Sequence, residues 1–208
     1  ATFHPLFTPP TTLSFGQRAS VKKTSQNSAV PSGCVMPRTS MPGCFIGTNR
    51  YEMPLCFGNE YPAYYYSVPP EEREQRIEYG GSWCYVDEEH FFHRGRLTIP
   101  IIDYHEDLVF NVWTTISEDN FCLRMDLWED PKRINQEPYF GWMQTDVPAY
   151  GKTISLKTIA IEQELGLIPE IKMIEENHPL TIDQENGITF EKAVAIVNEI
   201  MKIQHGKT

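Results

Sequence analysis

One stretch of the sequence, residues 82–101 (SWCYVDEEHFFHRGRLTIPI), constrains the fold more than any other. Two runs rich in aromatic and β-branched residues, 83–86 and 91–101, lie on either side of an acidic turn at residues 87–89. Such residues suit a pleated, half-buried surface, so the stretch predicts two strands around a turn. Gly95 interrupts the second run, where we expect either a β-bulge or a close approach of another part of the chain.

Hydrophobic periodicity predicts the other elements. Polar residues 103–107 separate two apolar runs, which indicates an antiparallel hairpin. Apolar residues at helical spacing predict a long helix over residues 190–204. Strands in runs, with the helices segregated from them, favour an α+β fold with a mostly antiparallel sheet and packed helices. The remaining predicted elements are strands at 97–102, 108–116, 139–147, 153–161 and 168–175, and helices at 71–78 and 118–129.

The charges divide the chain into two segments. Residues 1–51 contain five basic residues and no acidic one, whereas the rest of the chain holds all 28 acidic residues and 13 basic ones. An asymmetry of this kind is typical of a basic tail on an acidic body. We therefore predict an irregular extension rich in Pro, Ser and Thr over residues 1–50, followed by a single α+β domain over residues 51–208.

The extension has scattered apolar residues without a period, and such a composition cannot bury enough surface to fold alone. We expect it to bind protein subunits of a larger assembly; the alternative is that it packs on its own body. The acidic body argues against nucleic acid as a partner, whereas the extension could contact it. The basic residues expected to contact the partner are Arg18, Lys22, Lys23 and Arg38.

Composition also bears on the compartment. A basic, hydroxyl-rich segment without acids resembles an organellar transit segment, so we expect an organelle interior, mitochondrial or plastid, with the cytoplasm as the alternative. On this interpretation an initiator methionine or a longer presequence was removed before Ala1. No apolar run approaches the ~18 residues that a membrane span requires. The five cysteines form no C-x-x-C pair, so the sequence predicts neither a zinc knuckle nor a redox motif.

Two histidines in the central stretch, His90 and His93, invite a metal-site hypothesis because carboxylates lie beside them. In a strand, residues three apart point to opposite faces, so these two side chains cannot bind one ion. We therefore predict no metal site. His90, Arg94 and Arg96 share one strand face and form a basic row, which could bind a phosphate or carboxylate or pair with the neighbouring glutamates.

No other pattern carries recognisable chemistry. Asp103 and His105 could form an acid–base pair, but no nucleophile stands in a recognisable elbow, and a solvated hairpin tip is the simpler interpretation. The sequence contains no glycine-rich phosphate loop and no dinucleotide fingerprint. We predict no catalytic residue and no cofactor. The run at residues 64–66 is either an exposed tyrosine patch or an aromatic wall packed under a loop.

Several separated motifs resemble an uncharacterised bacterial family, domain of unknown function 2199, over about residues 53–201. The likeness implies one fold across these residues and no known activity. Members commonly begin with a C-x-x-C-G element, of which the cysteine positions here hold Phe45 and Ile46, and carry an aliphatic residue where this chain has His93. The matching motifs are residues 83–92, 94–97, 99–101, 112–113, 117–121, 127–128, 139–142, 148–150, 156–158, 178–180 and 187–189.

The sequence leaves two classes of function open. The first, which we favour, is a non-enzymatic accessory or structural subunit that its N-terminal extension holds in a larger protein assembly. The second is a small-molecule enzyme or ligand-binding domain that uses the basic row. Contacts between the extension and another chain would favour the first, and a deep pocket at His90, Arg94 and Arg96 would favour the second.

Overall fold

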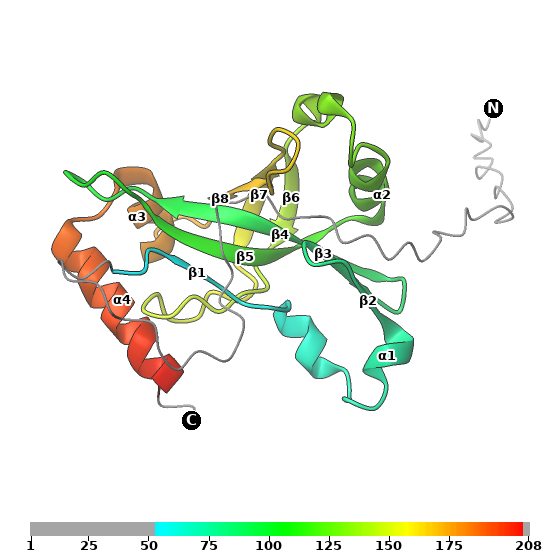
Figure 1. Ribbon diagram of the computed structural model, residues 1–208, viewed down its shortest axis with the longest axis horizontal. Helices are drawn as coiled ribbons and strands as arrows, with labels where there is room; N and C mark the ends of the chain where they lie inside the picture. Colours follow the sequence, from blue (N-terminus) through cyan, green and yellow to red (C-terminus); the bar gives the residue numbers. More distant parts are fainter. Residues whose placement is uncertain (1–52, 206–208) are drawn as a thin grey trace, which may run out of the picture. The chain divides into compact units, whose positions relative to one another are not determined.

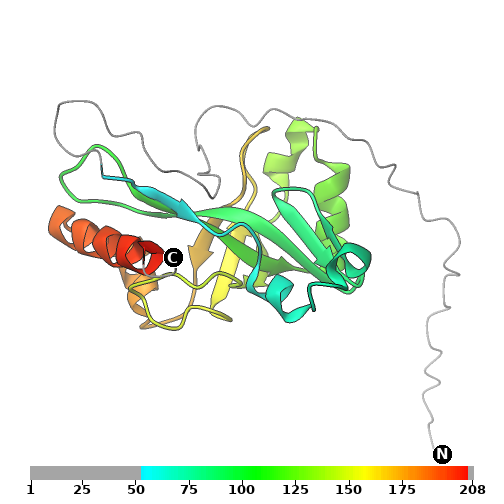
Figure 2. The ribbon, with the colours of Figure 1, turned by 60° about the horizontal axis from the view of Figure 1, so that its bottom comes forward.

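A computed structural model describes residues 53–205, which form a mixed, mostly antiparallel eight-stranded sheet with helices packed against it (Figures 1 and 2). The α+β prediction is therefore confirmed. In both views α4 and α2 lie near opposite ends of the long β4–β5 hairpin. The strand bounds are β1 Cys56–Gly58, β2 Ile77–Tyr79, β3 Trp83–Val86, β4 His90–Ile99, β5 Leu108–Ile116, β6 Tyr139–Trp142, β7 Lys157–Ile161 and β8 Glu170–Met173.

The centre of the sheet is the hairpin that the sequence predicted. β4 pairs antiparallel with β5 over nine positions, and β3 pairs with the first half of β4. Asp87 and Glu88 have φ angles of 55° and 56°, so the turn before β4 is tight and left-handed. Gly95 pairs regularly with Val112 and forms no bulge. A Cβ at Gly95 would lie 2.4 Å from the Ile171 side chain. Of the two expectations for Gly95, the close approach of another part of the chain is therefore the correct one.

The path through the sheet runs β1-β5-β4-β8-β7-β6, with β2 and β3 beside the first half of β4. β1 is parallel to β5, and β8 meets β4 through one parallel pair, Arg96 with Glu170. The sheet curls until its last strand returns to β5. There Thr114 forms an antiparallel bridge with Met143, and the Gln144 amide donates to the Trp113 carbonyl at 2.7 Å.

Three strands are shorter than the sequence predicted. We expected strands over 139–147 and 153–161, but the chain leaves the sheet between Trp142 and Lys157. Within that interval Ala149 and Ser155 have left-handed φ angles of 71° and 67°, which a strand does not accommodate. β8 is also trimmed at both ends.

The helices confirm the strongest periodic prediction and correct weaker ones. α4 buries Ala193, Ile196, Val197 and Ile200 of the predicted apolar stripe, whereas its fifth member, Ile203, is 40% exposed. α2 begins as predicted, and the Ser117 hydroxyl caps it by accepting a hydrogen bond from the Asn120 backbone amide. It ends three residues earlier than predicted. The predicted helix at 71–78 is one turn followed by β2. The helices are η1 Ala63–Ser67, α1 Arg73–Arg76, α2 Glu118–Asp126, η2 Pro131–Asn135, α3 Pro179–Asn186 and α4 Phe190–His205.

The two faces of the hairpin carry separate hydrophobic clusters. The larger one includes Leu97, Phe110 and Ile171 and extends to α4. The smaller one lies on the other face and consists of Val68, Cys84, Val86, Phe92 and Trp113.

Among residues 53–205, none of the helices combines the length and the apolar character that crossing a membrane demands.

Candidate functional site: a tyrosine groove above a pinned loop

The predicted basic row does not form one continuous surface. His90 is exposed and its ring lies 4.6 Å from that of Tyr64, and Arg96 is exposed further along β4. Arg94, between them, is only 8% exposed. His93 lies on the opposite face and is fully buried, which confirms that the two histidines diverge.

The guanidinium of Arg94 is held by the chain itself. It lies 4.7 Å from the centre of the Trp113 ring, and one nitrogen, Nη2, donates to the carbonyls of Asn59 and Glu60 at 2.8 and 2.7 Å. The Trp113 indole nitrogen donates to the same Asn59 carbonyl at 3.1 Å. A buried cation usually requires such partners. Arg94 therefore fixes the loop that leads into Tyr61.

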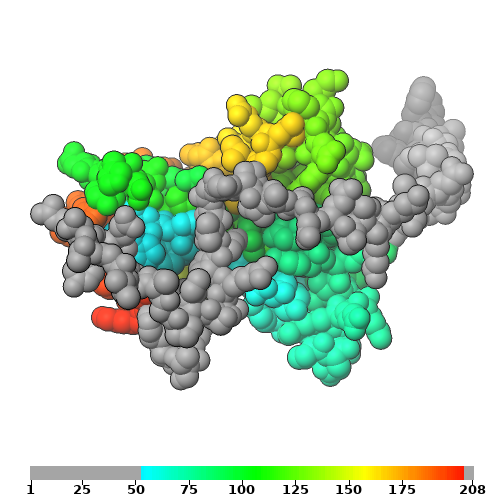
Figure 3. Space-filling view, in the orientation of Figure 1, coloured from blue at the N-terminus to red at the C-terminus, as the bar shows by residue number. Residues whose placement is uncertain are grey.

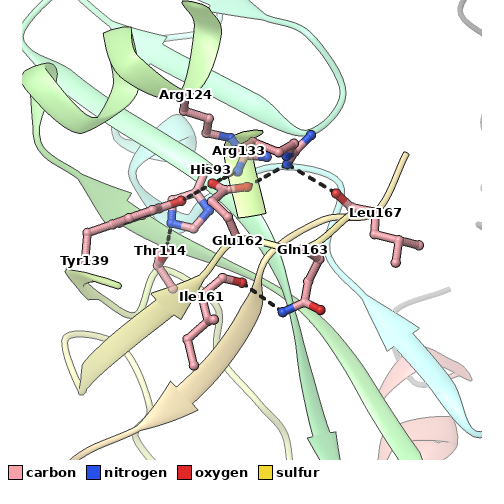
Figure 4. A network of polar contacts seen from close by, with 9 residues as sticks. All are labelled: His93, Thr114, Arg124, Arg133, Tyr139, Ile161, Glu162, Gln163 and Leu167. Atoms are coloured by element: carbon pink, nitrogen blue, oxygen red, sulfur yellow. Dashed lines mark hydrogen bonds and ion pairs between the residues drawn. The ribbon is translucent and has the colours of Figure 1, made fainter. Parts of the chain in front are cut away.

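A second polar centre, drawn in Figure 4, is buried under α2 and η2. The carboxylate of Glu162 binds the guanidinium of Arg124 from α2, that of Arg133 from η2 at 2.6 Å, and the Tyr139 hydroxyl at 2.7 Å. Glu162 is 2% exposed and both arginines are buried. The contacts join Glu162, just after β7, to the consecutive elements α2, η2 and β6, so this cluster clamps the α2–η2 segment to the sheet.

Electrostatics keep the cluster in its ionised form. Burial alone raises the pKa of Glu162, but Arg124, the Tyr139 hydroxyl and Arg133 together outweigh burial and leave that pKa below its usual value. Burial raises the pKa of Tyr139 far above its usual value, so its hydroxyl stays protonated and donates. Neither of two hollows on the surface of residues 53–205, described below, is lined by a residue of this cluster. A clamp fits this geometry better than a ligand site.

His93 lies beside the cluster and is neutral at physiological pH. Its Nε2 is 2.8 Å from Thr114 Oγ1 on the paired strand, and its ring meets Tyr139 edge-on at 5.3 Å. Burial, reinforced by the positive charge of Arg124, lowers the pKa of His93 to about 3. A histidine in this state has no access to solvent, and it acts as a packed core residue.

The more open of the two hollows is a groove of about 400 Å³ between the segment that carries η1 and the segment that carries α1 and β2 (Figure 3 shows these segments in cyan to teal). We call it the tyrosine groove. Its side chains come from a loop, a 3-10 helix, a proline pair, one turn of α-helix and a short strand. It is lined by Tyr61, Tyr65, Pro70, Arg73, Glu74, Ile77 and Tyr79.

The aromatic rings of the groove support one another. Tyr61 stacks on Tyr65 with ring centres 3.9 Å apart and planes 11° apart, and it contacts Tyr79 at 4.9 Å. Arg73 lies over the Tyr65 ring at 4.6 Å and donates to the Val68 carbonyl at 2.9 Å. Rings fixed in this way form a wall whose shape exists before any ligand arrives.

The groove is acidic at its edge, and the phenols of Tyr61 and Tyr79 stay protonated. Burial and the adjacent charge of Glu60 raise the pKa of Tyr61 to about 12. Burial also raises the pKa of Tyr79, whose hydroxyl donates to the carbonyls of Glu60 and Gly81 at 3.3 Å each. The groove thus offers flat aromatic faces, neutral hydroxyl groups and a negative edge.

Sequence reasoning found only part of this groove. From the sequence, the tyrosine run at 64–66 is either an exposed patch or a packed aromatic wall. In the structure one of its residues is exposed and another is packed. Tyr66 is 61% exposed, whereas Tyr64 packs on the smaller hydrophobic cluster. The sequence does not indicate that Tyr61 and Tyr79 belong to one site, because the two rings, 4.9 Å apart, meet only in the folded chain.

A smaller hollow, of about 40 Å³, lies near the start of β5 and has room for a few water molecules at most. It lies between Asn59, Asn111 and Asp146, among other residues. Its size excludes a substrate, so the tyrosine groove is the stronger candidate for a binding site.

Metal ligands were not expected from the sequence. Within residues 53–205, no three His, Cys, Asp or Glu side chains gather as a set that could hold an ion. In the described part of the chain, the three cysteines Cys56, Cys84 and Cys122 form no disulfide bond with one another. Cys34 and Cys44 lie outside the described residues, as do all four residues proposed for the partner-binding extension, Arg18, Lys22, Lys23 and Arg38.

Comparison with known proteins agrees with the motifs. The sequence model of a family described as "uncharacterized protein conserved in bacteria (DUF2199)" matches residues 44–188. No curated protein and no solved structure matches the chain. The matched residues contain the tyrosine groove, the Glu162 cluster and every strand of the sheet, and they end just before α4.

Proposed function

This chain belongs to the DUF2199 family of uncharacterised proteins conserved in bacteria, and from that premise we propose that it is a non-enzymatic accessory subunit of a larger protein assembly. The extension over residues 1–50 fastens it to that assembly. The body, from residue 51 onward, is the folded domain that the assembly carries.

One observation favours this role over catalysis: the buried polar side chains Arg94, Glu162 and His93 are engaged in holding the fold. Arg94 binds two carbonyls and a tryptophan face, and Glu162 binds two arginines and a tyrosine. His93 is buried against Thr114. Three of the seven residues that line the larger hollow are instead tyrosines, which are enriched at protein interfaces. The body therefore resembles a recognition module more than an enzyme.

The charge distribution supports the fastening role of the extension. Residues 1–51 carry a net charge of +5, opposite in sign to the body. Ordering the extension costs on the order of 1 kcal/mol per residue in backbone entropy. A basic segment without a periodic apolar face must gain that free energy from contacts with a partner surface. Arg18, Lys22, Lys23 and Arg38 supply the charges for such contacts.

The test compares the full-length chain with a chain lacking residues 1–40, both expressed with an affinity tag in cells of the source organism. We expect the full-length chain to elute within a large particle on size exclusion. The shortened chain should elute as a free, cooperatively melting domain. A full-length chain that elutes alone from a native extract would overturn the proposal. A shortened chain that still joins the particle would remove the fastening role of the extension.

The compartment of this assembly is a separate hypothesis. An organelle interior rests on the composition of residues 1–50 alone, and membership of a family described from bacteria gives it no support. The alternative function, a ligand site at His90, Arg94 and Arg96, stays a prediction. It requires Arg94 to release the carbonyls of Asn59 and Glu60.

A further inference from the structure

We infer that the tyrosine groove binds a proline-rich, basic segment of a partner protein in the polyproline II conformation. This inference rests on the proposed function, because it names the chemistry of one partner that such a subunit would recognise. The site differs from the N-terminal extension, since its residues belong to the folded body. Four properties of the groove carry the inference: its faces, its openness, its rigidity and its charge.

The faces suit proline rings. Proline-rich segments dock into grooves lined by aromatic side chains, where their rings pack flat against the aromatic faces. Here Tyr61 and Arg73 cover the Tyr65 ring, so the 39% exposed ring of Tyr79 is the one open to a proline, with Ile77 and Pro70 beside it. The hydroxyl groups stand at the ends of these rings. The Tyr79 hydroxyl already donates to the carbonyls of Glu60 and Gly81, so contact with the ring, and not a hydrogen bond from Tyr79, would hold the segment.

The openness of the groove excludes most small ligands. A small-molecule site buries most of its ligand within a concave pocket. The tyrosine groove has a suitable volume, about 400 Å³, but its edges lie in solvent, where Tyr79 is 39% exposed and Glu74 is exposed. An extended segment that runs along the surface fits this shape, because it needs contact on one side only.

The groove is rigid in part because the buried Arg94 on β4 holds the loop that leads into it. Arg94 and Trp113 both donate to the carbonyls of residues 59 and 60, directly before Tyr61. Ile77 packs on the smaller hydrophobic cluster below, and the ring centres of Tyr79 and Trp113 are 6.1 Å apart. A pre-formed wall lowers the entropic cost of binding, as does the pre-extended polyproline II segment itself. Arg94 thus acts as a positioning residue for the groove.

The charge of the groove selects a basic ligand. Glu74 lines the groove and Glu60 lies against Tyr61. The one cation of the lining, Arg73, keeps its charge beside the Tyr65 ring and the Val68 carbonyl, so the two carboxylates leave the groove a surplus of one negative charge. Lysine or arginine beside the prolines of a partner would therefore meet acidic groups. An acidic proline-rich segment would be repelled.

The experiment measures binding of a fluorescent synthetic peptide, built from Arg-Pro-Leu-Pro-Pro repeats, to the purified full-length chain by anisotropy. Two control peptides are used, one with alanine for proline and one with glutamate for arginine. We expect binding in the micromolar range for the first peptide and at least tenfold weaker binding for both controls. Equal binding of all three peptides, or of none, overturns the inference.

Matched variants locate the binding. Tyr79→Ala should weaken the peptide about tenfold, whereas Tyr104→Ala, an equally exposed tyrosine at the hairpin tip, should not change it. Glu74→Lys should weaken it several-fold, whereas Glu185→Lys on α3 should not. The melting temperature of each variant is measured first, and Glu74→Lys provides the test if Tyr79→Ala does not fold. Loss of binding in the two control variants, or none in the two groove variants, places the peptide elsewhere.

The chain's own extension is the competing occupant, because residues 1–50 also contain prolines and basic residues. A full-length variant with alanine at Pro5, Pro9, Pro10, Pro31, Pro37 and Pro42 separates the two cases. If the peptide binds only to this variant, the groove serves the chain's own segment and the partner assignment is wrong. A chain that joins its assembly but binds no peptide would overturn this inference alone and leave the proposed function intact.

Discussion

Arg94 and Trp113 are directly paired across β4 and β5, and the guanidinium of one lies 4.7 Å from the ring centre of the other. In the sequence Arg94 resembles a surface group that could bind a ligand. In the structure Arg94 and Trp113 support the loop at residues 59 and 60, because both donate to the Asn59 carbonyl. Position along a strand predicted which face Arg94 occupies. It could not predict that residues more than thirty positions earlier would cover that face.

The first prediction separates the two arginines of the basic row. Arg94→Ala removes two charge-assisted hydrogen bonds and leaves the Asn59 and Glu60 carbonyls only the longer ones from Trp113 and Tyr79, so it should lower the free energy of unfolding by about 1–3 kcal/mol. Arg94→Lys should restore only part of this, because an ammonium group does not reproduce the planar contact with Trp113. Arg96→Ala, exposed on the same strand, should change stability by less than about 0.5 kcal/mol. Urea unfolding of all three checks this; equal effects at both positions would contradict it.

The second prediction concerns Glu162. Glu162→Gln leaves the buried Arg124 and Arg133 without a counter-charge, which should cost about 3–5 kcal/mol of stability. Glu164→Gln, two residues away and exposed, is the matched control and should be nearly neutral. Thermal and urea unfolding measure both. If Glu162→Gln loses less than about 1 kcal/mol, the cluster does not clamp the α2–η2 segment.

The third prediction concerns pH. The folded pKa of His93, about 3, lies below the ordinary value of 6.5, so between these values the unfolded chain binds the extra proton. Stability should therefore fall as the pH drops from 7 to 5, by about 2 kcal/mol from this group. Glu162, whose pKa is lowered, adds a further loss only below about pH 4.5.

The matched variant for this pH dependence is His93→Leu, which should unfold with a flatter pH profile between 7 and 5. His90→Leu, at an exposed position on the same strand, should keep the profile of the original chain. The measurement is the urea midpoint at several pH values. An unchanged slope in His93→Leu would mean that His93 takes up its proton in the folded state.

The sequence predicts local structure well wherever the signal is periodic or continuous. The β4–β5 hairpin and α4 are where the patterns placed them, because each buries a long apolar face. β1 and β2 were missed because three residues are too few to establish a period. The partners of Glu162 were missed because they lie 38, 29 and 23 positions away and meet only in the folded chain.

The fourth prediction compares two isoleucines on α4. Ile200 is 3% exposed and Ile203 is 40% exposed. Ile200→Asp buries a charge without a partner and should cost several kcal/mol, enough to unfold a typical domain. Ile203→Asp should leave the melting temperature within a few degrees. Circular dichroism melts of the two variants decide it, and equal melting temperatures would show that α4 does not pack through this face.

The last prediction concerns the approach of β8 to β4. A Cβ at Gly95 would lie 2.4 and 2.5 Å from Cγ1 and Cδ1 of Ile171, and 3.0 Å from the Pro169 carbonyl oxygen. Because Ile171 is fully buried, it has no free space to move into. Gly95→Ala should therefore cost about 1–3 kcal/mol through overpacking.

A double-mutant cycle with Ile171→Ala isolates the cause. Ile171→Ala alone should cost about 2–5 kcal/mol, because it leaves a cavity. In that background both clashing side-chain atoms are gone, so Gly95→Ala should cost clearly less than it does alone. Urea unfolding of the four proteins gives the coupling free energy. Additive effects, within about 0.5 kcal/mol, would mean that Gly95 is required by the Pro169 carbonyl or by its own backbone, and that the Ile171 side chain does not set the distance between these strands.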